Sequence, residues 1–93
     1  MEIKIINIRE SRIANSMCKA FIDTQIDNLI IKGMRIIDGR NGMFISYPRE
    51  KGKDERFYDL VIPADMNTKQ EIEKYLLDEY FKFKEDKLPP EAD

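Results

Sequence analysis

The pattern of hydrophobic and polar residues changes once along the chain. Up to residue 62, short runs rich in isoleucine and aromatic residues alternate with turn residues, a pattern typical of β-strands. We predict strands over residues 3–9, 16–24, 29–37, 43–47 and 57–62. Gly33 inside the third run predicts a β-bulge or the close approach of another backbone, and the stretch DGRNG at 38–42 predicts a tight turn.

The second predicted strand does not reveal which of its faces is buried. Its side chains alternate between two sets, with Met17, Lys19, Phe21 and Asp23 on one face and Cys18, Ala20 and Ile22 on the other. Both sets contain apolar residues, so either face can be turned to the core. Residues 24–28 either continue this strand or form a short turn.

The order of the strands follows from their connections. Successive strands joined by short links favour an antiparallel meander. We therefore expect strand 57–62 to pair with strand 43–47, with the charged segment of residues 48–56 as their connection. Pro48 and Pro63 mark where these two strands end.

After residue 66 the spacing of the apolar residues becomes helical. One face of the predicted helix carries Ile72, Leu76, Tyr80 and Phe83. A capping box is predicted at its start, formed either by Asn67 with Gln70 or by Thr68 with Glu71. The sequence therefore predicts an α+β fold, with a small antiparallel sheet of four to five strands followed by a C-terminal helix.

The length of the chain limits how many domains it forms. A chain of 93 residues can hardly build two hydrophobic cores, so we expect residues 1–87 to form a single domain. Residues 88–93 contain paired prolines that cannot continue a helix. We expect this segment to be a flexible C-terminal tail.

The composition excludes several classes of function. Sixteen Lys and Arg residues oppose eighteen Asp and Glu residues, so the chain lacks the overall basic excess of many nucleic-acid-binding domains, although a local basic patch is compatible with this balance. The chain has no histidine and one cysteine, Cys18, which excludes a Ser–His or Cys–His nucleophile pair and a metal site built from imidazoles or several thiolates. We predict no enzymatic activity, no small-molecule substrate, no cofactor and no metal.

The N-terminus and the cysteine content bear on location. The first ten residues, MEIKIINIRE, lack the basic start and apolar core of a signal peptide, and no apolar run approaches the length of a membrane span. A single cysteine forms no intramolecular disulfide, which suits a reducing compartment. We predict a cytoplasmic protein that does not associate with membranes.

The charged segment holds the clearest candidate chemistry. Its basic residues are Arg49, Lys51, Lys53 and Arg56, and three acidic residues lie among them. In one interpretation it is a solvated connection whose charges discourage aggregation at a sheet edge. In the other, Arg49, Lys51 and Lys53 contact phosphates. Lys69 is a further candidate, because the first turn of a helix favours anions. Residue types alone leave both interpretations open.

The aromatic residues and the apolar run at 29–37 indicate how the core is packed and whether the chain forms a dimer. Most aromatic residues fall at core spacing, so we expect them in the core and not stacked on nucleic-acid bases. The run at 29–37 is apolar on both faces, more than one small sheet with one helix can cover. This predicts a homodimer in which this run or the first strand pairs across a two-fold axis.

The stretch RIIDGRNGMFI at 35–45, a proline, the charged segment and then FYDLVIP at 57–63 together resemble the stage V sporulation protein G (SpoVG) family of septation regulators. The resemblance extends through Thr68, Ile72 and the run LDEY at 77–80. It implies a cytoplasmic, homodimeric, non-catalytic regulator that binds DNA or RNA and dimerises through its sheet. It also implies nucleic-acid contacts at Arg49, Lys51, Lys53 and Lys69. The alternative is a protein-interaction module that binds through a sheet edge or the helix.

Three positions depart from the pattern of the family. Tyr58 stands where family members often carry a basic residue, Ile62 where they carry histidine, and Glu71 where they carry lysine. These replacements remove positive charge beside the expected contact surface. They predict nucleic-acid binding that is weaker, altered in preference or lost.

Overall fold

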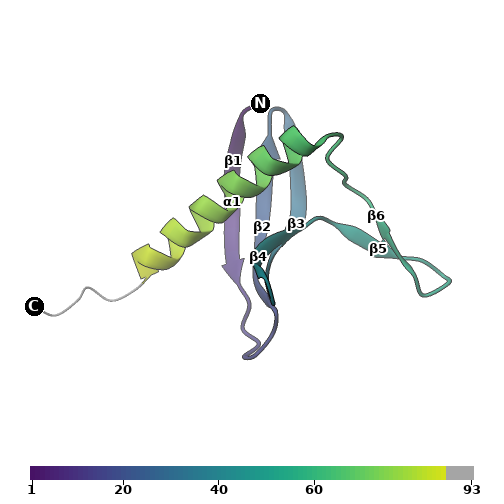
Figure 1. The fold of residues 1–93 in the computed structure, drawn as a ribbon, viewed down its shortest axis with the longest axis horizontal. Coiled ribbons are helices and arrows are strands. Elements are labelled where there is room, and N and C mark those ends of the chain that lie inside the picture. The colour runs from purple at the N-terminus through teal and green to yellow at the C-terminus, as the bar shows by residue number, and fades with distance from the viewer. Residues whose placement is uncertain (88–93) are drawn as a thin grey trace, which may run out of the picture.

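The structure is a computed structural model and describes residues 1–87. A four-stranded antiparallel sheet has the order β1 (Ile3–Glu10), β2 (Cys18–Ile26), β3 (Leu29–Gly39) and β4 (Gly42–Ser46). Two short strands, β5 (Arg49–Lys51) and β6 (Phe57–Asp59), form a second sheet, and α1 (Met66–Lys87) ends the described chain (Figure 1). The predicted α+β arrangement is confirmed. The predicted tail at 88–93 lies outside the described residues.

The predicted turn and bulge are both present in the meander. Strands β3 and β4 join at Arg40 and Asn41, and the φ angle of 114° at Gly42 suits glycine. In the β2–β3 pair, Ile22 lies opposite Met34 and Thr24 opposite Ile31, so β3 has one more residue than β2 between these pairs. Gly33 lies in this bulge with a φ of 89°. Residues 24–26 continue β2, and the turn follows at Asp27.

The pairing predicted for the charged segment is wrong. Strand β6 does not pair with β4; it pairs with β5, which lies inside the segment expected to be a connecting loop. Pro48 follows β4 and has no N–H for a sheet ladder, so the chain leaves the large sheet there. The strand predicted to reach Ile62 also ends at Asp59. The resulting hairpin, residues 49–59, projects away from the large sheet (Figure 1) and is called the finger below.

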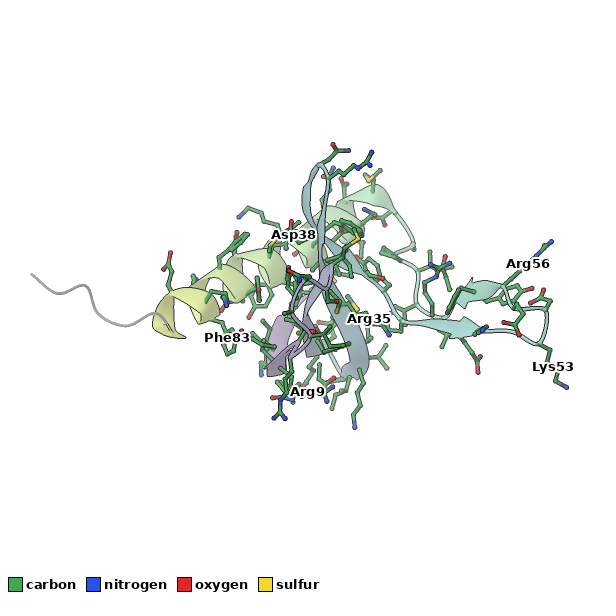
Figure 2. All side chains as sticks on the ribbon, turned by 90° about the horizontal axis from the view of Figure 1, so that it is seen from below. Arg9, Arg35, Asp38, Lys53, Arg56 and Phe83 are labelled. Carbon is green, nitrogen blue, oxygen red and sulfur yellow. The ribbon has the colours of Figure 1, made fainter. Side chains whose placement is uncertain are left out.

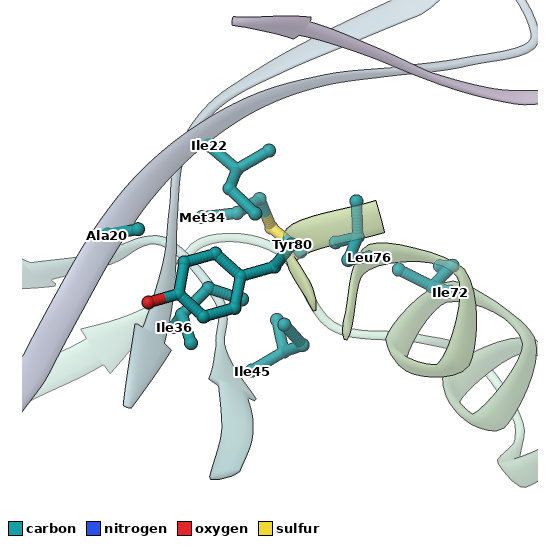
Figure 3. Close-up of a cluster of buried hydrophobic side chains, with 8 residues drawn as sticks. All are labelled: Ala20, Ile22, Met34, Ile36, Ile45, Ile72, Leu76 and Tyr80. Carbon is teal, nitrogen blue, oxygen red and sulfur yellow. The ribbon is translucent and has the colours of Figure 1, made fainter. Parts of the chain in front are cut away.

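The core forms between one face of the large sheet and α1. Ala20, Ile22 and Thr24 of β2 are fully buried, so the even-numbered residues of this strand face the helix, which settles the register that the sequence left open. The sheet contributes Met34, Ile36 and Ile45 to the same cluster, and the helix contributes Ile72, Leu76 and Tyr80 (Figure 3). Phe83, predicted on this helix face, is partly buried and packs against the cluster.

The helix begins with a different cap from the predicted boxes. Asp65 precedes Met66, and its Oδ1 accepts a hydrogen bond from the backbone N–H of Thr68 at 2.7 Å. Its carbonyl oxygen accepts one from the N–H of Lys69 at 3.1 Å. The Thr68 N–H holds the pKa of the Asp65 carboxyl below its usual value. Asp65 is therefore the N-cap residue, and the predicted boxes started two or three residues too late.

Asp65→Ala is expected to lower the midpoint of thermal unfolding at pH 7 by a few degrees, because it removes the acceptor for an unpaired helix N–H. The pKa of Asp65 is lowered in the folded state, so its contribution is present above the unfolded pKa of about 4 and is lost as the pH falls through the lower folded pKa. The difference between wild type and variant should therefore shrink at pH 3. Circular-dichroism melts at both pH values measure this, and an equal difference at both would contradict it.

Within residues 1–87, α1 is the only helix, and it is not apolar enough to cross a membrane. No group of three or more His, Cys, Asp or Glu side chains in the same range is placed to hold a metal ion.

Candidate nucleic-acid interface

The finger is closed at its tip by a small hydrogen-bond network. The N–H of Gly52 donates to the carbonyl of Arg56 at 2.7 Å, and the Tyr58 hydroxyl donates to Oδ2 of Asp54 at 2.5 Å. A Cβ atom on Gly52 would lie 2.7 Å from the Tyr58 ring, so the tip needs glycine there. Tyr58, one of the three positions that depart from the family pattern, therefore helps to close the tip of the finger through its hydrogen bond to Asp54.

The hydrogen bond between Tyr58 and Asp54 also favours the ionised form of the Asp54 carboxyl at the tip. The hydrogen bond from Tyr58 is the largest cause that lowers the pKa of the Asp54 carboxyl, and the N–H of Arg56 adds to it. The same bond raises the pKa of the Tyr58 hydroxyl. Asp54 is therefore ionised and Tyr58 protonated at neutral pH. The finger as a whole is balanced in charge, because residues 49–59 contain four basic and four acidic side chains.

Three of the four predicted contact residues form ion pairs. Arg49 Nε lies 3.2 Å from Oδ1 of Asp59, Lys51 Nζ lies 2.6 Å from Oε2 of Glu55, and Lys69 Nζ lies 2.9 Å from Oε2 of Glu73. Arg49 also lies over the Phe57 ring, with Cζ 5.3 Å from its centroid. The pairs of Arg49 with Asp59 and of Lys51 with Glu55 are exposed and therefore weak, so a phosphate can compete for these two cations. In the third pair the Glu73 side chain is only 15% exposed, so its carboxylate lowers the positive potential at Lys69 more strongly.

The fourth predicted residue, Lys53, lies at the tip of the finger together with Arg56 (Figure 2). In the part of the chain that the structure describes, neither side chain has a carboxylate within ion-pairing distance. Both are exposed and extend away from the large sheet. These two cations are the part of the finger best placed to meet a phosphate.

Lys69 lies apart from the tip but shares a hollow with Arg49. The hollow has a volume of about 440 Å³ and lies between β4, the finger base and the start of α1. On its wall the Tyr47 hydroxyl donates to Oε2 of Glu73 at 3.2 Å, the same oxygen that pairs with Lys69. Burial, with a smaller effect of Glu73, raises the pKa of Tyr47. The structure thus brings Arg49 and Lys69 together and leaves Lys51 and Lys53 further out on the finger.

The expectation that the aromatic residues lie in the core is only partly met. Tyr80 is buried, but Phe44, Phe57, Tyr58 and Phe81 are each about half exposed. Two of these belong to the finger. Phe21 is half-buried and lies on the large sheet between two arginines, Arg9 and Arg35. The sequence analysis did not single out these arginines, because only the strand register reveals their position.

The fold defines a small α+β protein, with a sheet covered on one face by a single helix and a charged finger beside it. The chain belongs to the SpoVG family, whose model matches residues 1–82. A relative from Clostridium perfringens strain SM101, named "Putative septation protein SpoVG", is 35% identical over 85 residues, which cover 90% of this chain and 93% of the relative.

Two further relatives carry the same name. The one from Clostridium kluyveri is 32% identical over 92 residues, or 98% of this chain and 95% of the relative. The one from Bdellovibrio bacteriovorus is 29% identical over 82 residues, or 87% of this chain and 71% of the relative. The match therefore extends through the sheet, the finger and most of the helix, and includes the N-terminal strands, where the sequence pattern was less specific.

Proposed function

We propose that this protein is a homodimeric regulator of septation that binds DNA or RNA without catalysis, through Arg49, Lys51, Lys53 and Lys69. The observation that carries the proposal is the projecting finger, whose tip cations Lys53 and Arg56 have no acidic partner within residues 1–87. Gly52 and the bond between Tyr58 and Asp54 hold the tip in one conformation. The names of the relatives, which describe septation proteins, support the link to septation.

Lys51→Ala/Lys53→Ala is the direct test of the finger. Each phosphate contact contributes about 0.7 to 0.9 to the slope of log K against log salt, so the loss of two contacts should flatten the slope by roughly 1.5. Affinity should fall alike for all sequences, since phosphate contacts do not distinguish bases. Fluorescence anisotropy with labelled DNA and RNA at several salt concentrations measures both quantities.

The matched control is Lys74→Ala/Lys82→Ala on the exposed side of α1. It removes the same charge from two side chains that pair within the helix, with Asp78 and Glu79. This variant should bind nearly as well as wild type. If the finger variant binds with wild-type affinity and salt slope, the finger is a solvated hairpin and does not contact the phosphates.

The second partner in the proposal is another copy of this chain. Leu29 and Ile30 at the start of β3 are 70% and 57% exposed, although Met34 and Ile36 further along the strand are covered by the helix. The outer edges of β1 and β4 have no neighbouring strand within the described residues. Unpaired edges and exposed apolar residues of this kind favour pairing with a second chain.

The expected solution mass is therefore about twice the 11.0 kDa of the chain. Multi-angle light scattering at micromolar concentration measures it. Leu29→Lys/Ile30→Lys should shift the population toward the monomer, because it places charge in the expected contact. A wild-type mass near 11.0 kDa at this concentration would contradict the dimer.

The alternative, a protein-interaction module, is favoured by the apolar residues that follow the finger. Leu60 and Ile62 are 59% and 69% exposed and lie between the finger and α1. Apolar docking should change little with salt, whereas phosphate binding weakens steeply. A partner captured with a flat salt dependence, together with no binding to DNA or RNA, would favour this alternative.

A further inference from the structure

The face of the large sheet that points away from α1 carries a row of side chains across all four strands. Arg9 of β1 lies directly opposite Phe21 of β2, and Phe21 lies opposite Arg35 of β3. Arg35 in turn lies opposite Ser46 of β4. Directly paired residues of antiparallel strands point to the same face. Because Phe21 alternates with the buried Ile22, the row lies opposite the helix. Arg9, Phe21, Arg35 and Ser46 are called the cross-strand row below.

The two arginines of the row flank the phenylalanine. Arg9 Cζ lies 5.8 Å and Arg35 Cζ lies 5.6 Å from the centroid of the Phe21 ring, within the range of a cation–π contact. Because neighbouring strands lie roughly 4.8 Å apart, the Cα atoms of Arg9 and Arg35 are about 10 Å apart. The row therefore presents an aromatic ring with a planar cation on either side.

Two hollows continue the row at its ends. At the β1 end, Arg9 and Phe21 line a hollow of about 840 Å³ together with Arg12. At the other end, Arg35 and Ser46 line a hollow of about 360 Å³ together with Lys32 and Arg49. Five basic residues thus follow the row from the end of β1 to the base of the finger: Arg12, Arg9, Lys32, Arg35 and Arg49.

Most of these cations are less neutralised than those of the finger. Among the described residues, no carboxylate lies within ion-pairing distance of Arg9, Arg12, Lys32 or Arg35. Arg49 is the exception, because it pairs with Asp59. Within residues 1–87, four cations along the row thus have no carboxylate partner, whereas the charge-balanced finger has two such cations, Lys53 and Arg56.

Two acidic residues lie close to the row. Glu10 lines the hollow at the β1 end, but its Oε2 lies 3.2 Å from Nζ of Lys84 on α1. Asp23 follows Phe21 on the same face of β2 and accepts a hydrogen bond from the N–H of Gly33 at 3.4 Å. Glu10 is therefore paired with a lysine of the helix, and Asp23 with the backbone of the bulge.

We infer that this face of the sheet is a track for single-stranded nucleic acid, with bases stacking on Phe21 and on the guanidinium planes of Arg9 and Arg35, and phosphates meeting the charges of these two arginines and of the basic residues at the two ends. This inference rests on the proposed nucleic-acid binding and names the surface and the form of the ligand. Stacking requires unpaired bases that can turn toward the sheet, and in a duplex the base faces are covered by their neighbours. If the face bound only phosphates, the Phe21 ring would not contribute to the affinity.

Fluorescence anisotropy with a labelled oligothymidylate and a labelled oligouridylate of about 15 nucleotides, and with a duplex of the same length, tests the track. Arg9→Ala/Arg35→Ala should flatten the salt slope for the single strands by about 1.4, at roughly 0.7 for each lost phosphate contact. Phe21→Leu keeps an apolar side chain but removes the stacking surface, and should weaken single-strand binding roughly 5- to 150-fold. Duplex binding should change less in both variants.

Two comparisons separate stacking from charge and from folding. Arg9→Lys/Arg35→Lys keeps both charges and loses the planar groups, so the salt slope should stay while single-strand affinity falls. Lys74→Ala/Lys82→Ala removes the same charge as the alanine pair but on α1, and should leave binding unchanged. Circular dichroism identifies any variant that fails to fold. If the alanine pair does not fold, Arg9→Lys/Arg35→Lys still tests the track, because it preserves the charge of the sheet.

The outcomes distinguish this inference from the function on which it rests. Single-strand binding lost in the face variants and kept in the helix control supports the track. If the variants of Arg9, Arg35 and Phe21 all bind single strands with wild-type affinity, and only Lys51→Ala/Lys53→Ala loses binding, the track is overturned and the finger remains the binding surface. No binding of any nucleic acid by wild type overturns the proposed function itself. If polyglutamate displaces the labelled single strand as well as an unlabelled single strand does, and Arg9→Lys/Arg35→Lys keeps full affinity, the face binds acidic polymers in general and the track is overturned.

Discussion

Leu76→Ala is expected to lower the free energy of unfolding by about 2–5 kcal/mol, the largest effect of any substitution considered. The Leu76 side chain is fully buried in the middle of α1, against the cluster contributed by the large sheet. Truncation removes its apolar contacts and leaves a cavity that the single covering helix can only partly close. Since domains of this size are stable by roughly 5–15 kcal/mol, the loss is a large fraction of the total. Urea denaturation followed by circular dichroism measures it.

Phe81→Ala is the control for this substitution. Phe81 is a larger side chain on the same helix, but it is 47% exposed and lies outside the buried cluster. Its truncation should cost clearly less than that of Leu76, because less apolar surface returns to water. A loss for Leu76→Ala no greater than for Phe81→Ala would mean that the helix is not packed on the sheet as described.

The elements of this fold could be predicted wherever local pattern determines them. The change in the spacing of apolar residues near residue 66 predicted the helix, and the first four apolar runs predicted the strands of the large sheet, including the bulge at Gly33. The finger could not be predicted, because β5 consists of Arg49, Glu50 and Lys51 and has no apolar alternation. Its pairing with β6 depends on Pro48 taking the chain away from the large sheet, which the apolar pattern of the segment does not reveal.

The candidate site shows the same division between local and non-local information. Sequence pattern located the basic residues of the charged segment, but it could not show that Arg49, Lys51 and Lys69 face carboxylates. The alignment of Arg9, Phe21 and Arg35 depends on two strand pairings that each contain an irregularity in register. A slip of one residue would move these side chains to the other face, so only the folded sheet reveals the row.

Gly33→Val is expected to destabilise the fold by about 1–3 kcal/mol, because a β-branched residue rarely adopts the positive φ of 89° found in the bulge. A Cβ atom at this position would have no heavy atom within 4 Å, so the cost comes from backbone conformation and not from a clash. Gly33→Asn is the matched variant and should cost less, since asparagine tolerates positive φ better.

The same substitution should also disturb the surface beside the bulge. Lys32 precedes Gly33, and Arg35 follows two residues later in the cross-strand row. A valine that forces the bulge into regular pairing would shift the register on one side of it and turn side chains to the opposite face. We therefore expect Gly33→Val to weaken single-strand binding more than Gly33→Asn does, at a temperature where circular dichroism shows both variants folded. Wild-type stability together with wild-type affinity in Gly33→Val would show that the bulge does not hold the sheet in the register that aligns Arg9, Phe21 and Arg35.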